Sequence, residues 1–246
     1  MELFERFGLA GGLRWLHVLA GITWIGLLYY FNVVQVPSFA AYADEARARN
    51  VSINVLARRA LDWFRWSALT TLVLGLLITG ATKDYYSDFF DRADGVSIFI
   101  GMIFGITMAA NVWMVIWPQQ RVILANAAGV LADQPANPDA PAAGRKALLA
   151  SRQNLIFSIP MLWFMVATSH FYVAADFASP DSGAVWAFII IALGIALVME
   201  LNALGVIGGT APGPLKWPYE HHRHAIITGF VFWAVLWILS EVLLQA

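Results

Sequence analysis

Residues 13–32 read LRWLHVLAGITWIGLLYYFN, an apolar stretch of 20 residues with one histidine, His17, near its start. A helix of about 20 apolar residues spans the hydrocarbon core of a bilayer. An ionisable side chain inside that layer is energetically costly and is a functional candidate by default. The stretch therefore predicts a transmembrane helix whose histidine has a function. The alternative is a structural histidine that only hydrogen-bonds a neighbouring helix.

Several residues are expected to share one helix face with His17, because positions three, four and seven apart lie on the same side. Arg14 lies one turn before the histidine, and Ala20 and Gly21 lie one turn after it. Trp24 lies two turns after it. A cation, an imidazole, small residues and an indole in this order are what a flat macrocycle with carboxylates needs. The same pattern also fits plain helix packing near a membrane interface.

The composition of the 246-residue chain is that of a polytopic membrane protein. Charged residues make up 13% of it and hydrophobic residues 60%, whereas about 25% of a soluble domain is charged. The net charge of −1 does not indicate a nucleic-acid partner. The chain has no cysteine, which excludes disulfides, thiolate metal sites, iron–sulfur clusters and covalent c-type haem attachment. A metal or haem would need histidine, methionine, carboxylate or carbonyl ligands.

The hydropathy pattern predicts an all-α membrane helix bundle that forms a single integral domain over residues 1–246. Six transmembrane spans are expected, at residues 11–36, 62–80, 95–117, 154–173, 184–207 and 225–244. Pro37 and Pro118 are expected to end the first and third spans, because proline disrupts a helix interior. Residues 38–61 are polar and basic, which predicts an amphipathic helix on the membrane surface.

Basic residues are concentrated in the loops after the first, third and fifth predicted spans. These loops hold Arg47, Arg49, Arg58, Arg59, Arg121, Arg145, Lys146, Arg152, Lys216 and Arg223, against Arg6, Arg14, Lys83 and Arg92 on the other side. By the positive-inside rule the basic loops are cytoplasmic. We therefore expect a multi-pass protein of the bacterial inner membrane, surrounded by membrane lipid, with both termini in the periplasm.

This topology places a second histidine, His170, at the depth of His17. The fourth span runs outward, so each histidine is expected about 5–10 Å below the outer interface, at 1.5 Å per residue. Trp163 lies seven residues before His170, as Trp24 lies seven residues after His17. Two imidazoles at one depth predict a b-type haem whose iron both histidines ligate, with Arg14 near the propionates. The residues predicted to bind it are His17, His170, Arg14, Trp24, Gly21 and Trp163.

Three blocks of sequence resemble the membrane domain of the bacterial cytochrome-c-linked urate hydroxylase family. They are residues 13–32, NVWMVIWPQQR at residues 111–121, and SRQNLIFSIPMLWFMVATSHFY at residues 151–172. The first block is also similar, more distantly, to the histidine-bearing helix of HemJ-type protoporphyrinogen oxidases and CopD-type proteins. The resemblance implies a membrane-integral redox protein that oxidises urate, a purine, and passes electrons to a c-type cytochrome.

In that family the cytochrome is commonly fused at the C-terminus, whereas this sequence ends at Ala246 without a cysteine. The expected electron acceptor is therefore a separate c-type cytochrome or a respiratory complex, and the substrate stays open.

A second polar cluster is expected on the cytoplasmic side. Glu200 lies in the inner half of the fifth span and Asn111 in the inner part of the third, and YEHHRH at residues 219–224 precedes the sixth. A buried carboxylate near histidines is able to bind a metal, relay protons or hold a quinone or purine-like substrate. Glu200, Asn111, His221 and His224 are therefore second candidates for a catalytic role. The alternative is that the histidines only anchor the helix at the membrane surface.

These observations leave three classes of function open. The first is a redox enzyme or electron carrier with a b-type haem near the outer face. The second is a non-catalytic accessory or structural subunit of a larger membrane complex. The third is a transporter, indicated by Glu200 and the proline within the fourth span, but no inverted repeat supports it.

Overall fold

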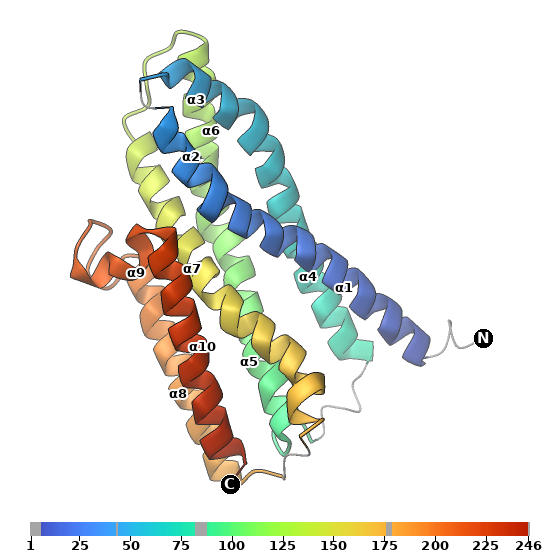
Figure 1. The fold of residues 1–246 in the computed structure, drawn as a ribbon. Coiled ribbons are helices and arrows are strands. Elements are labelled where there is room, and N and C mark those ends of the chain that lie inside the picture. Colours follow the sequence, from blue (N-terminus) through green and yellow to red (C-terminus); the bar gives the residue numbers. More distant parts are fainter. Residues whose placement is uncertain (1–5, 43, 82–87, 176–178, 246) are drawn as a thin grey trace.

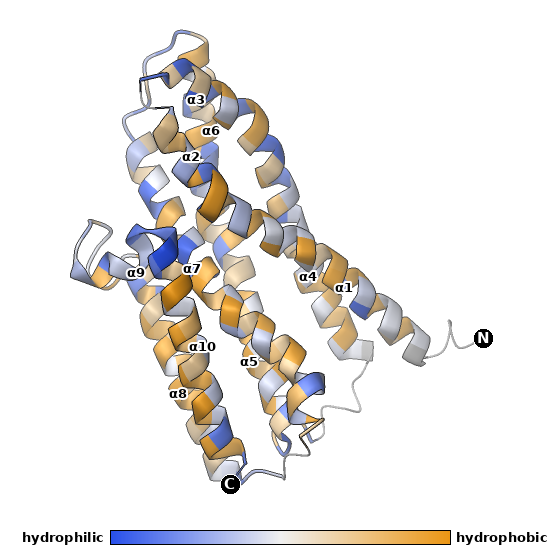
Figure 2. Ribbon diagram, viewed as in Figure 1, coloured by the Kyte–Doolittle hydropathy of each residue, from blue (hydrophilic) through white to orange (hydrophobic). Residues whose placement is uncertain are grey.

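The protein, seen in a computed structural model, is described over residues 6–42, 44–81, 88–175 and 179–245. Within these ranges every regular element is helical, and no strand occurs. Six of the described helices are long and apolar enough to cross a membrane: Gly8–Ala41, Ala46–Gly80, Ala93–Leu131, Ala140–Tyr172, Ser182–Ala203 and His222–Leu244. The predicted all-α bundle with six spans is therefore confirmed (Figure 1). Hydrophilic residues gather at the end of the bundle near α3, α6 and α9 (Figure 2).

Most of the long helices consist of two or more elements. The first long helix consists of α1 (Arg6–Tyr29), η2 (Tyr30–Gln35) and α2 (Val36–Ala41). The second consists of α3 (Ala46–Ser52), η3 (Ile53–Ala57) and α4 (Arg58–Ala81). The third consists of α5 (Ala93–Ala110), η5 (Asn111–Ile116) and α6 (Trp117–Leu131). The remaining elements are α7 (Ala140–Ala167), η6 (Thr168–Tyr172), α8 (Ser182–Ala203), η7 (Pro214–Lys216), α9 (Trp217–Glu220) and α10 (His222–Leu244). The elements η2, η3, η5 and η6 are π-helical turns, and η7 is a 3₁₀ turn.

Pro37 and Pro118 do not end their helices, contrary to the expectation from sequence. A π-helical turn comes just before each proline, η2 before Pro37 and η5 before Pro118. Proline inside a regular α-helix removes one hydrogen bond and clashes with the carbonyl group four residues earlier. In both helices the residue before the proline instead bonds the carbonyl group five residues back. The wider turn relieves the clash, and the helix continues past the proline.

The expected surface helix over residues 38–61 is not a separate element. Residues 36–41 complete the first long helix, and residues 46–81 form one continuous helical run. No proline or glycine occurs between residues 46 and 74, so nothing in the sequence interrupts this run. The basic segment is thus the start of the second long helix.

Helix α7 is the centre of the bundle. It packs against α5, α6, α8, α9 and α10, whereas α1 packs mainly against α4. Residues 152–158 of α7 are all buried. The rings of Phe104, Phe157 and Phe232 join α5, α7 and α10, with centroids 5.0 and 5.7 Å from Phe104. The α1–α4 pair therefore lies against one side of the group formed by α5, α6, α7, α8 and α10 (Figure 1).

Candidate functional site

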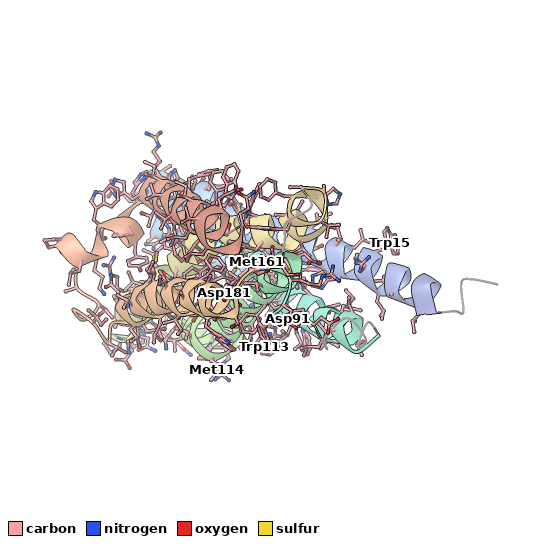
Figure 3. The ribbon with its side chains drawn as sticks, turned by 90° about the horizontal axis from the view of Figure 1, so that it is seen from below. Trp15, Asp91, Trp113, Met114, Met161 and Asp181 are labelled. Atoms are coloured by element: carbon pink, nitrogen blue, oxygen red, sulfur yellow. The ribbon has the colours of Figure 1, made fainter. Side chains whose placement is uncertain are left out.

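A cavity of 380 Å³ lies between the α1–α4 pair and helices α5 and α7. Its walls are almost entirely apolar and include Gly21, Gly26, Gly75 and Gly105. Met161 of its wall lies near the centre of the bundle and is 5% exposed, whereas Trp15 lies out on α1 and is 64% exposed (Figure 3). Cofactor and ligand pockets are typically about 300–1,000 Å³ with mostly apolar walls. The cavity is thus of a size and character that suit an apolar cofactor.

Among the described residues that line this cavity, His17 is the ionisable one. Its Nδ1 lies 2.8 Å from the carbonyl oxygen of Thr71 on α4. Because a carbonyl oxygen only accepts, Nδ1 carries the proton and Nε2 keeps the lone pair. Metal-bound histidines almost always make such a second hydrogen bond, which fixes the tautomer and the orientation of the ring. His17 is therefore held in the tautomer that a metal ion requires at Nε2.

Gly75 of α4 allows the imidazole to lie close to the helix backbone. A Cβ at residue 75 would be 3.1 Å from Cε1 and 3.4 Å from Nδ1 of His17. Thr71 and Gly75 were missed in the sequence, although they lie four residues apart on one helix face. Only the pairing of α1 with α4 reveals that this face meets His17.

Gly21 and Trp24 also lie in the cavity wall. Trp24 is 2% exposed, and its Nε1 has no hydrogen-bond partner among the described residues. A buried donor without an acceptor costs about 1–3 kcal/mol. A bound group with an acceptor atom would remove this cost.

His170 and Arg14 do not lie in the cavity wall. His170 is exposed, and its Nδ1 lies 3.2 Å from the carbonyl oxygen of Val166 and 2.9 Å from the hydroxyl of Ser169. Val166 itself lines the cavity, so His170 follows the wall by one helical turn. Arg14 is exposed, one turn before His17. The structure therefore brings His17 into the cavity and leaves His170 beyond its rim, and ligation by both stays a prediction.

Trp163 lies on the side of α7 that faces α10. Its ring centroid is 5.5 Å from that of Trp233 and 5.0 Å from that of Trp237. The spacing of seven residues from His170 mirrors that of Trp24 from His17, but it does not determine the rotation of α7. This packing gives Trp163 a structural role between two helices.

Glu200 is half-buried and belongs to a polar cluster, with the buried Asn111 and Asn154, that joins three long helices. Its Oε2 accepts a hydrogen bond of 3.2 Å from Nδ2 of Asn111, which also donates to Oδ1 of Asn154 at 2.9 Å. Nδ2 of Asn154 in turn donates to the carbonyl oxygen of Met108 at 2.9 Å. The cluster combines two residues that the sequence indicated, Glu200 and Asn111, with one that it did not, Asn154. The run of polar residues at positions 151–154, inside an otherwise apolar span, was the feature of the sequence that could have indicated Asn154.

His221 and His224 do not join this cluster. His224 donates from Nδ1 to the carbonyl oxygen of Trp217 at 3.0 Å, and its ring stacks on that indole at 4.2 Å. Nδ1 of His221 accepts from the backbone N–H of Arg223 at 3.2 Å, at the start of α10. In the described part of the chain, no group of three or more histidine, aspartate or glutamate residues has the geometry of a metal site. Both histidines therefore have local structural contacts.

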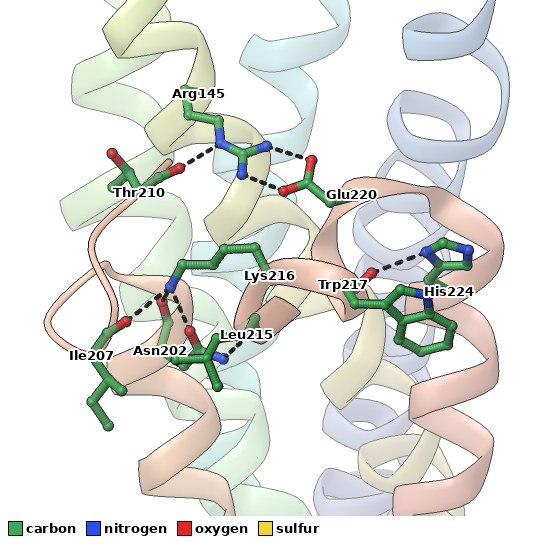
Figure 4. A network of polar contacts seen from close by, with 9 residues as sticks. All are labelled: Arg145, Asn202, Ile207, Thr210, Leu215, Lys216, Trp217, Glu220 and His224. Atoms are coloured by element: carbon green, nitrogen blue, oxygen red, sulfur yellow. Dashed lines mark hydrogen bonds and ion pairs between the residues drawn. The ribbon is translucent and has the colours of Figure 1, made fainter. Parts of the chain in front are cut away.

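Two cations hold the loop between α8 and α9 against the bundle (Figure 4). Arg145 donates to both carboxylate oxygens of Glu220, at 2.9 and 2.6 Å, and to the Thr210 carbonyl oxygen at 2.8 Å. Lys216 donates to the carbonyl and side-chain oxygens of Asn202 and, at 3.0 Å, to the carbonyl oxygen of Ile207.

Charge and burial shift the pKa values of this loop. The hydrogen bond from Arg145, followed by the charges of Arg145, Arg152 and Lys216, holds the pKa of Glu220 below its ordinary value. Burial lowers the pKa of Lys216, and the charge of Arg145 lowers it further. One carboxylate thus faces three cations at this end of the bundle.

The sequence was compared with models of known protein families. A family model described as urate oxidase N-terminal matches residues 76–203, just over half of the chain. Two of the blocks that carry the resemblance, residues 111–121 and 151–172, lie inside the matched region, and residues 13–32 lie before it. Comparisons with curated proteins and with solved structures found no match. The chain belongs to the urate oxidase N-terminal family.

Proposed function

We propose that the chain is a membrane-embedded redox protein that holds a b-type haem in the cavity between α1, α4, α5 and α7. One observation carries the proposal: His17 lines an apolar cavity, with Nδ1 hydrogen-bonded to Thr71 and the lone pair of Nε2 free for a metal. Imidazole is a common axial ligand of haem iron. Membership of the urate oxidase N-terminal family supports redox chemistry in this fold.

The residues of the cavity fit a flat, largely apolar group. Gly21, Gly75 and Gly105 expose helix backbone to the cavity, and Trp24 has a buried N–H without a partner among the described residues. In this proposal His17 would hold the haem iron through Nε2, and Arg14 would pair with the propionates. A bound haem supplies reversible one-electron transfer between ferric and ferrous iron.

His170 is the proposed second ligand. It follows Val166 of the cavity wall by one turn, and its Nδ1 contacts the carbonyl oxygen of that residue. Donation from Nδ1 to that carbonyl oxygen would leave the lone pair of Nε2 for the iron.

The proposed orientation in the membrane rests on the distribution of basic residues in the sequence. The positive-inside rule supports a cytoplasmic position for the basic loops, and the haem is therefore proposed to lie near the periplasmic face of the bacterial inner membrane. A separate c-type cytochrome or a respiratory complex is the proposed electron acceptor. By analogy with the family, urate is the proposed substrate.

Visible absorption and pyridine haemochrome analysis of the purified full chain test this proposal. The wild-type protein is expected to show a b-type spectrum that is lost in His17→Ala. In His170→Ala the spectrum is expected to change from that of a two-histidine iron to that of a one-histidine iron. His222→Ala, at the other end of the bundle, is the matched control and is expected to keep the wild-type spectrum. A folded, colourless wild-type protein, purified after haem supply, would overturn the proposal and favour the accessory-subunit function.

A further inference from the structure

Arg152, near the middle of α7, is a buried cation, and two of its three guanidinium nitrogens have no hydrogen-bond partner among the described residues. It is 2% exposed, and neither Nε nor Nη1 has a partner in the described part of the chain. A buried charge is tolerated when it is paired and costly when it is not. Because a guanidinium keeps its proton in proteins, Arg152 has no way to become neutral. The energetic cost therefore points to a partner outside this chain.

Gln153, the next residue, has the same property. It is 0% exposed, and neither Oε1 nor Nε2 has a partner among the described residues. Buried polar groups are nearly always hydrogen-bonded, so each exception needs an explanation. Neighbouring residues on a helix point about 100° apart, so these two long side chains are able to reach one ligand between them.

The polar residues on either side of this pair are satisfied within the fold. Ser151 accepts a hydrogen bond of 2.8 Å from Asn32, and Asn154 is bonded to Asn111. Depth in the bundle therefore does not explain why Arg152 and Gln153 are unpartnered. The pair differs from its neighbours because Nε and Nη1 of Arg152 and both amide atoms of Gln153 have no hydrogen-bond partner among the described residues.

The charges near Arg152 favour an anion. The Glu220 carboxylate lies within electrostatic range of Arg145, Arg152 and Lys216, but both of its oxygens are hydrogen-bonded to Arg145. Arg145 of α7 and Lys216 of the loop after α8 lie near each other at this end of the bundle (Figure 4). A local excess of positive charge raises the local concentration of anions.

We propose that Arg152 and Gln153 form a binding site for a small planar organic anion that enters from the α9 end of the bundle. The guanidinium offers a planar fork of donors to a pair of acceptor atoms. The carboxamide both donates and accepts, which matches an edge with adjacent N–H and C=O groups. The inference rests on the proposed function in one respect, that this anion is the substrate that is oxidised.

This anion site is separate from the cavity that contains His17. Arg152 lies nine residues before Met161 of the cavity wall, which is about 14 Å along the helix axis. Loss of one site therefore need not abolish the other, and the two are measured separately.

Binding of urate monoanion to the full chain in nanodiscs, measured by isothermal titration calorimetry, tests the inference. Arg152→Gln is expected to weaken binding at least about 30-fold, equal to about 2 kcal/mol at 1.4 kcal/mol per factor of ten. Gln153→Leu is expected to weaken it about tenfold. Arg121→Gln, which changes an exposed arginine, is the matched control and is expected to leave the affinity within about twofold. Equal weakening in the control, or none in Arg152→Gln, overturns the inference.

A second ligand tests the chemical class. Inorganic phosphate has acceptor oxygens but no adjacent N–H and C=O edge, so it is expected to bind more weakly than urate and to be insensitive to Gln153→Leu. Phosphate binding as tight as urate binding overturns the organic anion in favour of a simple oxyanion site.

Stability supplies an independent measurement. Replacing an unpaired buried charge with an apolar residue is expected to stabilise a protein, so Arg152→Met is expected to raise the midpoint of thermal unfolding without anion. A lower midpoint would mean that the fold itself satisfies Arg152, and this overturns the inference.

The visible spectrum of the same samples separates the two proposals. A colourless protein that binds urate through Arg152 retains this inference and refutes the haem. A haem-containing protein that does not bind urate refutes this inference alone.

Discussion

Replacing Gly75 with alanine tests how closely α4 holds the His17 ring. The added Cβ would lie 3.1 Å from Cε1 and 3.4 Å from Nδ1 of the imidazole, so the ring must move by a few tenths of an ångström. Movement of the ring away from α4 weakens a hydrogen bond, because Nδ1 is bonded at 2.8 Å to the Thr71 carbonyl oxygen on the same helix. We expect Gly75→Ala to tilt the imidazole away from α4 and to lengthen this hydrogen bond.

Two opposing effects set the change in the free energy of unfolding. Alanine in place of glycine within a helix stabilises by about 1 kcal/mol, whereas overpacking a well-packed site costs about 1–3 kcal/mol. The net change for Gly75→Ala is therefore a loss of about 0–2 kcal/mol. Gly194→Ala is the matched control, because a Cβ there would have nothing within 4 Å. It is expected to gain up to about 1 kcal/mol.

Equilibrium unfolding in mixed micelles, followed by tryptophan fluorescence, measures this difference. The visible spectrum of the same samples reports whether the proposed iron site has changed. We expect Gly75→Ala to be less stable than Gly194→Ala by at least about 1 kcal/mol and to have an altered haem spectrum. Equal stabilisation by both substitutions, with an unchanged spectrum, would refute a close contact between α4 and the ring.

Three further predictions concern the rest of the bundle. Asn111→Ala removes the donor to Glu200 and is expected to lower the free energy of unfolding by about 2–3 kcal/mol; an equal loss in a Glu200→Leu background, which has no acceptor, would contradict that pairing. Arg145 holds the pKa of Glu220 below its ordinary 4.5, so the ion pair stabilises the fold above pH 4.5, and this stability is lost as the pH falls through the lowered pKa. Thermal unfolding is therefore expected to show Arg145→Gln less stable than wild type at neutral pH, with a smaller gap in strong acid, where only the bond to the Thr210 carbonyl oxygen remains; a gap of the same size in strong acid would contradict the ion pair. Trp163→Ala is expected to cost about 3–5 kcal/mol through lost packing against α10 while leaving the visible spectrum unchanged, and a changed spectrum would place the indole near the cofactor.

The sequence by itself determined the number of long apolar helices. It also identified the ionisable residues inside those helices, whose burial in a membrane is energetically costly. Hydrophobic length alone identifies a span, because about 20 apolar residues match the thickness of the bilayer core. Position along a helix also follows from residue number, so the place of His17 along the first span was predictable. The high cost of a buried carboxylate required a polar partner for Glu200, and the structure supplies Asn111.

Tertiary structure decided which helix faces meet. A helix that is apolar all round carries little information about the direction of its neighbours, because lipid and protein partners are equally apolar. The pairing of α1 with α4 brings Thr71 and Gly75 to His17, and the rotation of α7 turns Trp163 toward α10. The π-helical turns before the prolines, and the absence of a partner for Arg152 among the described residues, also depend on packing that no single helix specifies. Contacts between helices are set by how side chains interlock, and that information exists only once the helices are assembled.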